Sequence, residues 1–439
     1  MNYKEACDYV NHIPRYKKKF NQDNILHLLE TIGRPDSSFK SIHIVGTNGK
    51  GSVAAFLNSI GRSKGFKMGV FTSPHLLTIR ERFVVNGTLI SEEDFVKYLE
   101  QVLEAEETIL EDGFEHLTFF EIMFAMALLY FKDEGVDYAI IEAGMGGRSD
   151  STNSLKPEIT VITAIGLDHQ SVLGDTIEKI AYEKAGAVNQ GEVVTVSRQS
   201  KNVLDIIEDY IYVVGGEAIY ANNLVYNVEK ADQYGIDFCL NYDIDKSISY
   251  HLSMSGLYQV DNAVVSIMTA RVLWNMDYEE LVTPLSNVSW AGRMQEVANR
   301  FYVDGAHNHQ AVQSFVATVK NSFTDSPKIL IYAVACDKDD RAMLKELLKL
   351  SIKVLIVTEL SNGRKTEASQ IVKLVDDLVA NECLNKPESV LVETTIDTAI
   401  SYAQTLQGED DYIFAVGSLY LVSDVMKRLI DQKEGDKDD

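Results

Sequence analysis

The glycine-rich segment GTNGKGS, at residues 46–52, is the part of the sequence best suited to holding phosphate groups. It follows an apolar run at 41–45 that we expect to be a strand, and it opens an expected helix. Backbone N–H groups in such a turn, together with a helix N-terminus, attract anionic oxygens, and Lys50 adds a mobile positive charge. The strict P-loop pattern is not met, because Gly51 separates Lys50 from Ser52. A turn that is glycine-rich only for packing is the alternative, and the strand–loop–helix context favours phosphate binding.

Polar side chains also stand where the next two expected strands end. Glu142 closes the apolar run at 137–143, and His169 follows the run at 159–165. The carboxyl ends of parallel strands meet at one edge of a sheet, which is where such sheets bind ligands. A carboxylate there suits a metal ion near nucleotide phosphates. An ion pair between Glu142 and Arg148 explains the glutamate equally well, and a lone histidine is more often a hydrogen-bonded structural residue.

Other segments carry weaker signals. Lys184 lies on an expected helix, where a surface salt bridge with a neighbour such as Glu178 is the commonest role of a lysine. TSPHL at 72–76 and LTFFE at 117–121 can be explained by turn capping and core packing. Asp304, at the end of a strand in DGAHN, resembles the acidic residue that binds a ribose. None of these segments is specific by itself.

The elements that must position these residues alternate between strand and helix, which predicts parallel βαβ units and an α/β fold. Short β-rich runs at 211–256 interrupt the alternation and predict a small antiparallel meander. A second alternating block begins near residue 297. We therefore expect a larger N-terminal P-loop-type domain, with a mostly parallel sheet plus a small antiparallel sheet, and a smaller Rossmann-like C-terminal α/β domain. We place their limits at 1–295 and 296–439, and expect them to meet at a cleft because no Pro-, Gly- or Ser-rich linker separates them.

The charge, the cysteine spacing and the lack of long apolar runs indicate which kinds of partner the chain binds. Among 439 residues, 41 Lys and Arg face 65 Asp and Glu, and the resulting net charge of −24 disfavours nucleic-acid binding. Four cysteines lie far apart in the chain, which indicates neither structural zinc nor a disulfide framework and fits a reducing compartment. No run of about 18 apolar residues and no signal-peptide core occurs. We expect a cytoplasmic monomer that binds small molecules and neither nucleic acid nor membranes.

Taken together, the motifs occur in one order that resembles folylpolyglutamate synthase / dihydrofolate synthase, a branch of the ATP-dependent Mur ligase superfamily. The likeness runs from about residue 12 to about residue 428, and its segments are GTNGKGS, TSPHL, LTFFE, EAGMGGRSDSTN, GLDHQSVLG, EKAGA, GLYQVDNA, GR, DGAHN and GSLYLV. The resemblance implies that the larger domain binds ATP, Mg²⁺ and the pterin substrate, and that the smaller domain closes over it.

The resemblance also implies roles for individual residues. ATP, as co-substrate, would be bound by Asn48, Gly49, Lys50, Gly51, Ser52, Asn262, Arg293 and Asp304. Magnesium would be held by Ser73, Glu142 and His169, with Lys184 carbamylated, and the catalytic set would be Lys50, Lys184, His169 and Glu142. The pterin acid would contact Thr118, Phe119, Phe120, Glu121, Ser151, Thr152 and Asn153, while the incoming glutamate would face His307 and Ser418.

The chain departs from the family pattern at three places. Ala291 and His309 stand where the family usually has proline, and AGAVNQGEV follows Lys184 where an Ile and a Lys-Pro are common. These departures bear on hinge stiffness and substrate preference more than on the chemistry.

The implied reaction joins an acid to an amine. ATP would convert the pteroate or folate carboxylate to an acyl phosphate, which the amine of L-glutamate then attacks. Two alternatives stay open. One is another Mur-superfamily amino-acid ligase, such as a peptidoglycan-precursor ligase. Those ligases carry a further N-terminal domain, which we do not expect because the glycine-rich turn begins at residue 46. The other is a P-loop nucleotide switch that binds a protein partner.

Overall fold

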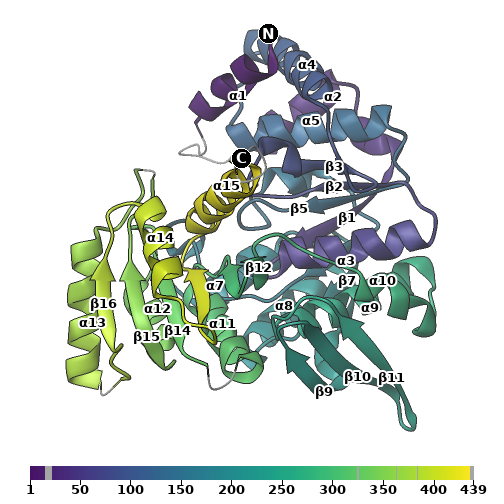
Figure 1. Ribbon diagram of the computed structural model, residues 1–439. Helices are drawn as coiled ribbons and strands as arrows, with labels where there is room; N and C mark the ends of the chain where they lie inside the picture. Colours follow the sequence, from purple (N-terminus) through teal and green to yellow (C-terminus); the bar gives the residue numbers. More distant parts are fainter. Residues whose placement is uncertain (15–21, 324–325, 362, 383, 436–439) are drawn as a thin grey trace. The chain divides into compact units, whose positions relative to one another are not determined.

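The structure is a computed structural model that describes residues 1–14, 22–323, 326–361, 363–382 and 384–435 (Figure 1). The chain divides into two compact units. Unit 1 comprises Met1–Tyr226, Cys239–Tyr250 and Val260–Val288, and unit 2 comprises Asn227–Phe238, His251–Gln259 and Ser289–Asp439. The domain limit proposed at 295/296 stays a prediction, and this division begins the last segment of unit 2 at Ser289.

The described part of unit 1 is built on an eight-stranded sheet in the order β4-β3-β2-β5-β1-β6-β7-β8. The strands from β2 to β8 in this order run parallel, and β3 and β4 add an antiparallel hairpin at one edge. Both turn residues of that hairpin, Asn86 and Gly87, have positive φ, as an Asn-Gly turn requires. The strands are β1 (Lys40–Val45), β2 (Met68–Phe71), β3 (Phe83–Val85), β4 (Thr88–Leu89), β5 (Tyr138–Glu142), β6 (Ile159–Ile162), β7 (Val193–Val196) and β8 (Glu217–Tyr220).

Helices cover both faces of this sheet. On one face, side chains of α4 and α5 form a core with Ala139 and Ile141 of β5, while α3 packs on the opposite face (Figure 1). Because both faces are covered, the central strands read as continuous apolar runs. The helices of this part are α1 (Tyr3–His12), α2 (Gln22–Thr31), α3 (Lys50–Ser63), α4 (Glu92–Glu111), α5 (Phe119–Asp133), α6 (Gln170–Leu173), α7 (Ile177–Ala185), α8 (Lys201–Val214), α9 (Gln259–Trp274) and α10 (Val282–Ser286), with 3₁₀ turns η1 (Pro35–Ser38), η2 (Ile79–Arg82), η3 (Ser151–Ser154), η4 (Ala221–Asn223) and η5 (Glu279–Leu281).

The predicted antiparallel meander is confirmed, but it covers residues 225–252 and not the whole of 211–256. A three-stranded sheet in the order β11-β10-β9 consists of β9 (Val225–Asp232), β10 (Gly235–Asp243) and β11 (Lys246–Leu252). The expectation was wrong for residues 211–224. Residues up to Val214 end α8, where Val203, Ile207 and Ile211 recur at helical spacing and are buried, and β8 pairs in parallel with β7. The β-branched residues at the end of α8, in the segment 211–214, are typical of strands, which explains the wrong prediction.

Unit 2 contains a six-stranded sheet in the order β12-β13-β17-β14-β15-β16 among the described residues. Only the edge strand β12 in this order is antiparallel, so the unit is Rossmann-like, and the predicted fold class is confirmed. The strands are β12 (Gln295–Ala298), β13 (Phe301–Asp304), β14 (Lys328–Tyr332), β15 (Ile352–Val357), β16 (Ser389–Val392) and β17 (Tyr412–Val416), and the helices are α11 (His309–Ser322), α12 (Asp340–Leu347), α13 (Ala368–Glu382), α14 (Ile396–Leu406) and α15 (Leu419–Gly435).

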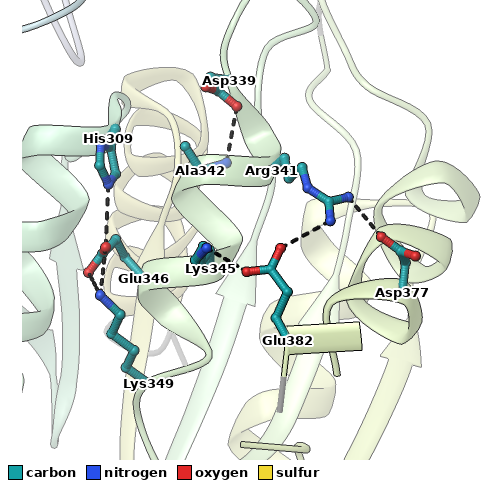
Figure 2. A network of polar contacts seen from close by, with 9 residues as sticks. All are labelled: His309, Asp339, Arg341, Ala342, Lys345, Glu346, Lys349, Asp377 and Glu382. Atoms are coloured by element: carbon teal, nitrogen blue, oxygen red, sulfur yellow. Dashed lines mark hydrogen bonds and ion pairs between the residues drawn. The ribbon is translucent and has the colours of Figure 1, made fainter. Parts of the chain in front are cut away.

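Ion pairs fasten α12 to its neighbours in unit 2 (Figure 2). Arg341 reaches Asp377 at 2.7 Å and Glu382 at 3.1 Å, and Lys345 also reaches Glu382, so α12 is joined to α13. The side chains of Arg341, Lys345 and Asp377 are about half exposed and that of Glu382 is 26% exposed, which limits what each pair contributes.

None of the helices in the described part of the chain combines the length and apolar composition that crossing a bilayer requires.

Candidate active site

The glycine-rich turn connects β1 to α3 in a conformation that its glycines make possible. Gly46 has φ 152°, and a Cβ there would lie 1.9 Å from Oγ1 of Thr163. Gly49 has φ 90°, and a Cβ there would lie 2.3 Å from Oδ1 of Asn262. The predicted ATP-binding residues of the turn and Asn262 of α9 are therefore neighbours. Lys50 is the first residue of α3, as the phosphate-binding interpretation requires.

Glu142 and Lys50 meet at the ends of β5 and the glycine-rich turn. Nζ of Lys50 lies 3.9 Å from Oε1 of Glu142 and donates hydrogen bonds to the carbonyl oxygens of Gly46 and Thr47 at 3.2 and 3.4 Å. Oε2 of the buried Glu142 accepts the N–H of Ser73 at 2.8 Å. A nearby cation and a donated N–H offset the cost of burying this carboxylate. The loop after β2 is thereby fastened to the end of β5.

Arg148, the alternative partner of Glu142, has other contacts. Its guanidinium lies 4.2 Å from the ring centroid of Tyr182 and 5.4 Å from that of Tyr210. The ion pair that the structure does show for Glu142 is with Lys50.

Lys184 is buried, which contradicts the interpretation of this residue as a surface lysine. It lies on α7, and its Nζ donates a hydrogen bond to the carbonyl oxygen of Gly46 at 2.8 Å. The pKa of Lys184 is lowered to about 7, mainly by burial and to a smaller extent by the positive charge of Lys50. Glu178, the expected surface partner, instead accepts a hydrogen bond from Asn202. At neutral pH a substantial fraction of the Lys184 amine is uncharged.

His169 follows β6 in an unusual backbone conformation. Its φ is 50°, in the left-handed region, and its N–H donates to Oδ1 of Asp168 at 2.8 Å. Among the described residues, no three or more His, Cys, Asp or Glu side chains gather closely enough to hold a metal ion. The predicted ligand set draws on a serine hydroxyl as well. It stays a prediction. The serine hydroxyl and the carboxylate are hard oxygen donors that suit Mg²⁺, and the hydrogen bond from the backbone N–H of Ser73 to Glu142 keeps the two residues adjacent.

The predicted substrate segment 118–121 begins α5. Thr118 and Glu121 cap this helix reciprocally, so their polar atoms serve the helix start in this structure. Phe120 packs so closely on the loop after β5 that a Cβ at Gly144 would lie 2.8 Å from its ring. The guanidinium of the buried Arg82 lies 5.1 Å from the ring centroid of Phe119 and donates to His75.

The second predicted substrate segment, Ser151–Asn153, lies in η3. Ser151 and Thr152 are buried, and the side-chain amide of Asn153 donates to the carbonyl oxygens of Arg148 and Gly186. Hydrogen bonds and an ion pair therefore bring the glycine-rich turn, Glu142, Ser73 and Lys184 together, and segment 151–153 lies beside Gly186, two residues after Lys184.

The candidate residues of unit 2 gather around Asp304 at the end of β13. Asp304 is buried and accepts hydrogen bonds from the Tyr258 hydroxyl and from the N–H groups of Met294 and Ala306. Burial raises the pKa of Asp304, and Arg293 opposes that rise. A Cβ at Gly305 would lie 2.1 Å from Nη1 of Arg293. These contacts bring two of the predicted ATP-binding residues, Arg293 and Asp304, together.

The two residues predicted to face glutamate lie on the neighbouring loops. Nδ1 of His307 lies 2.7 Å from the carbonyl oxygen of Gly305. Ser418, after β17, is buried, and its hydroxyl oxygen accepts the N–H of Tyr420 at 3.2 Å. His309, a departure from the family pattern, lies 3.3 Å from Glu346 of α12 (Figure 2).

Sequence reasoning missed three polar residues of these sites. His43 and Asp150 are buried in unit 1, and Tyr258 holds Asp304 in unit 2. His43 stands inside the apolar run SIHIV, and a polar residue at the centre of a buried strand is a signal in itself. Asp150 lies within the motif EAGMGGRSDSTN and Tyr258 within GLYQVDNA, but neither residue has a sequence feature that distinguishes it from its neighbours.

Two family descriptions match the two parts of this chain. Residues 44–270 match the family described as Mur ligase middle domain, and residues 292–419 match the Mur ligase, glutamate ligase domain. The dihydrofolate synthase/folylpolyglutamate synthase of Bacillus subtilis (strain 168) is 32% identical over 437 residues, which cover 97% of this chain and 99% of that protein.

Solved structures show the same fold. The folylpolyglutamate synthase of Thermotoga maritima is 28% identical with a TM-score of 0.82, and the match covers 98% of this chain and 96% of that one. An FPGS–AMPPCP complex is 26% identical with a TM-score of 0.82, over 98% of this chain and 100% of that one. The chain therefore belongs to the Mur ligase family, in the branch of the dihydrofolate synthases and folylpolyglutamate synthases.

Proposed function

We propose that this chain is an ATP-dependent ligase that adds L-glutamate to dihydropteroate, to tetrahydrofolate polyglutamates, or to both, through an acyl-phosphate intermediate. One observation carries the proposal. At the carboxyl edge of a parallel sheet, Lys50 of α3, Glu142 of β5 and Lys184 of α7 converge around Gly46. This edge is where open α/β sheets bind ligands.

The glycine-rich turn is the proposed site of the ATP phosphates. Asn48, Gly49, Lys50, Gly51 and Ser52 would surround them, with the start of α3 contributing its dipole. The Lys50 ammonium is held by backbone carbonyls in this structure, so it can turn toward phosphate oxygens at little cost. Asn262, Arg293 and Asp304 are the further proposed ATP contacts. The AMPPCP complex belongs to a relative and supports this placement.

Mg²⁺ is the proposed metal, with Ser73, Glu142 and His169 as its ligands. When bound, it would neutralise negative charge that develops on the phosphate oxygens. Glu142 is buried and already ionically paired, so its carboxylate is positioned before any ligand arrives.

Lys184 is proposed to carry a carbamate. Only the uncharged amine reacts with carbon dioxide. In that reaction an N–C bond forms, a C=O π bond of carbon dioxide opens, and a proton leaves the nitrogen, which turns the uncharged amine into an anion with two oxygens. A pKa near 7 makes the uncharged amine available at neutral pH. The alternative is that Lys184 stays cationic and contacts a phosphate directly.

The proposed reaction has two steps. An oxygen of the pterin acid's carboxylate attacks the γ-phosphorus of ATP, ADP leaves, and an acyl phosphate forms. The amine of L-glutamate then attacks the acyl carbon, the C–O bond to phosphate breaks, and an amide and inorganic phosphate result. The proposed contacts of the pterin acid are the segments 118–121 (Thr118, Phe119, Phe120 and Glu121) and 151–153, and those of glutamate are His307 and Ser418.

Release of phosphate from ATP is the decisive measurement. It is followed with dihydropteroate or tetrahydrofolate, each with and without L-glutamate. Turnover that needs both the pterin acid and glutamate is the expected result, and the pterin acid that works identifies which of the two activities is present. Turnover with a different acid and amino acid would assign another Mur-type ligase. ATP hydrolysis that ignores both substrates would favour a nucleotide switch.

A further inference from the structure

A chain of three buried polar side chains lies beneath the proposed site in unit 1. Nε2 of His43, on β1, lies 2.8 Å from Oγ1 of Thr152, and that hydroxyl lies 2.6 Å from Oδ1 of Asp150. The exposed fractions of His43, Thr152 and Asp150 are 1%, 0% and 3%. His43 and Asp150 have no role in the reaction proposed above, whereas Thr152 belongs to the segment 151–153 that was proposed there to contact the pterin acid.

The direction of the hydrogen bonds in this chain follows from the chemistry of its ends. Asp150 accepts from the N–H and hydroxyl of Thr152 and from the N–H of Met145, so both of its carboxyl oxygens act as acceptors. Burial raises the pKa of Asp150, and these donors oppose that rise. Since the Thr152 hydroxyl donates to Asp150, its oxygen must accept from His43. Burial lowers the pKa of His43 to about 4, so the ring is neutral and carries its proton on Nε2.

Asp150 closes the loop that follows Glu142. Its Oδ2 accepts the N–H of Met145 at 2.7 Å, so one carboxylate holds both the start of the loop and η3. The loop lies tightly on α7, because a Cβ at Gly147 would approach the Lys184 backbone to 2.8 Å. A shift of Asp150 would therefore move the loop relative to both Glu142 and Lys184.

We propose that His43 and Thr152 are positioning residues of the ligase site. His43 donates to Thr152, Thr152 donates to Asp150, and the oriented carboxylate keeps the loop 143–150 and the segment at 151–153 in place. The inference rests on the proposed function. It also revises one expectation, since Thr152 acts through Asp150 and does not touch the pterin acid.

Core packing alone does not explain the three residues. A buried polar group without a hydrogen-bond partner costs free energy, whereas an apolar side chain in mid-strand does not. Packing would be served by a methionine at position 43 and a valine at position 152. The matched pairs His43→Met with His43→Gln, and Thr152→Val with Thr152→Ser, separate the two explanations, because only Gln and Ser retain a donor at the right place.

The experiment has a kinetic and a ligand-free measurement. In His43→Met and Thr152→Val, we expect the KM for the pterin acid to rise about tenfold, which corresponds to loss of one buried hydrogen bond, while the KM for ATP stays within about twofold. His43→Gln and Thr152→Ser should recover most of the affinity. Without any substrate, hydrogen exchange of the Met145 amide should quicken about tenfold in the two apolar variants and not in the two polar ones.

Two results would overturn the inference. The first is equal behaviour of the polar and apolar variants in exchange at Met145 and in KM, which would show a packing role. The second is a lowered melting temperature in the apolar variants with both measurements unchanged. If the wild-type chain fails to ligate any pterin acid, the proposed function fails, and the exchange measurement still decides whether His43 and Thr152 hold the loop. The Thr152 pair decides the question if a His43 variant does not fold.

Discussion

The same kinds of charged side chain lie around Gly46 in unit 1 and around α12 in unit 2, but they are mostly buried in unit 1 and largely exposed in unit 2. Lys184 is 4% exposed and donates to a backbone carbonyl, whereas the Arg341 side chain on α12 is 49% exposed and pairs with two carboxylates (Figure 2). Burial lowers the pKa of Lys184 to about 7, while the carboxylates of Asp377 and Glu382 raise the pKa of the Arg341 guanidinium. The comparison shows what exposure decides. A buried amine has a shifted pKa that makes it reactive, whereas an exposed cation keeps its charge and only links two helices.

The largest effect is expected when the buried lysine is removed. Lys184→Ala should lower ligation by about a thousandfold or more, because the site would lose a charged group that no other residue replaces. Added acetate or formate should recover part of the activity if the residue works as a carbamate, since a small carboxylate fills the space with oxygens. The measurement is phosphate release with each additive.

The same variant also distinguishes the two proposed forms of Lys184. Small amines such as methylamine should give no recovery. Recovery by amines and not by carboxylates would mean that Lys184 acts as a cation, and the carbamate would be abandoned.

Lys50→Ala should lower ligation by about a hundredfold, because an electrostatic partner of the phosphates would be lost. The side chain is partly exposed and its partners are mainly backbone carbonyls, so the melting temperature should change little. Rates and melting curves of the same preparation test both statements. Near-normal turnover would remove the glycine-rich turn from the active site.

The buried Lys184 should also make the free energy of unfolding depend on pH. Its pKa is about 7 when folded and 10.5 when unfolded, so between these pH values the unfolded chain binds more protons. Stability should therefore rise with pH across this window, by up to about 1.4 kcal/mol per pH unit from this residue. Urea unfolding at pH 7 and pH 9, in buffer freed of carbon dioxide, measures the rise.

Lys184→Met is the matched control for that measurement, since it fills the site without a titrating group. The rise between pH 7 and pH 9 should be smaller in this variant than in the wild type. An unchanged rise would mean that other groups cause it, and that the lysine is solvated when the protein is free.

The smallest effect is expected in unit 2. Arg341→Ala removes both exposed pairs to Asp377 and Glu382, yet the melting temperature should shift by no more than about 2 °C. Ligation should stay unchanged, because α12 carries none of the proposed site residues. A large loss of stability would contradict the contrast drawn between the buried and exposed charges.

Local sequence patterns were enough for most of the fold. Residues 46–52 lie between β1 and α3, the Asn86–Gly87 turn forms the predicted hairpin, and Glu142 ends β5. These predictions succeed because turn chemistry and apolar runs act over a few residues. The failure at 211–224 has the same origin, since the β-branched end of α8 resembles a strand until its buried positions are known.

The sequence by itself determined which chemical groups stand at the carboxyl ends of the strands, and, as an ordered set of motifs, the family. Only the tertiary structure decided the state of those groups. Lys184 meets Gly46 across 138 residues of sequence, and Thr152 meets His43 across 109. Burial and hydrogen-bond partners set a side chain's charge and freedom, and both depend on contacts that no local pattern records. For that reason the sequence could name Lys184 and Thr152, but it could not show that Lys184 is a buried amine with a lowered pKa or that Thr152 links two other buried side chains.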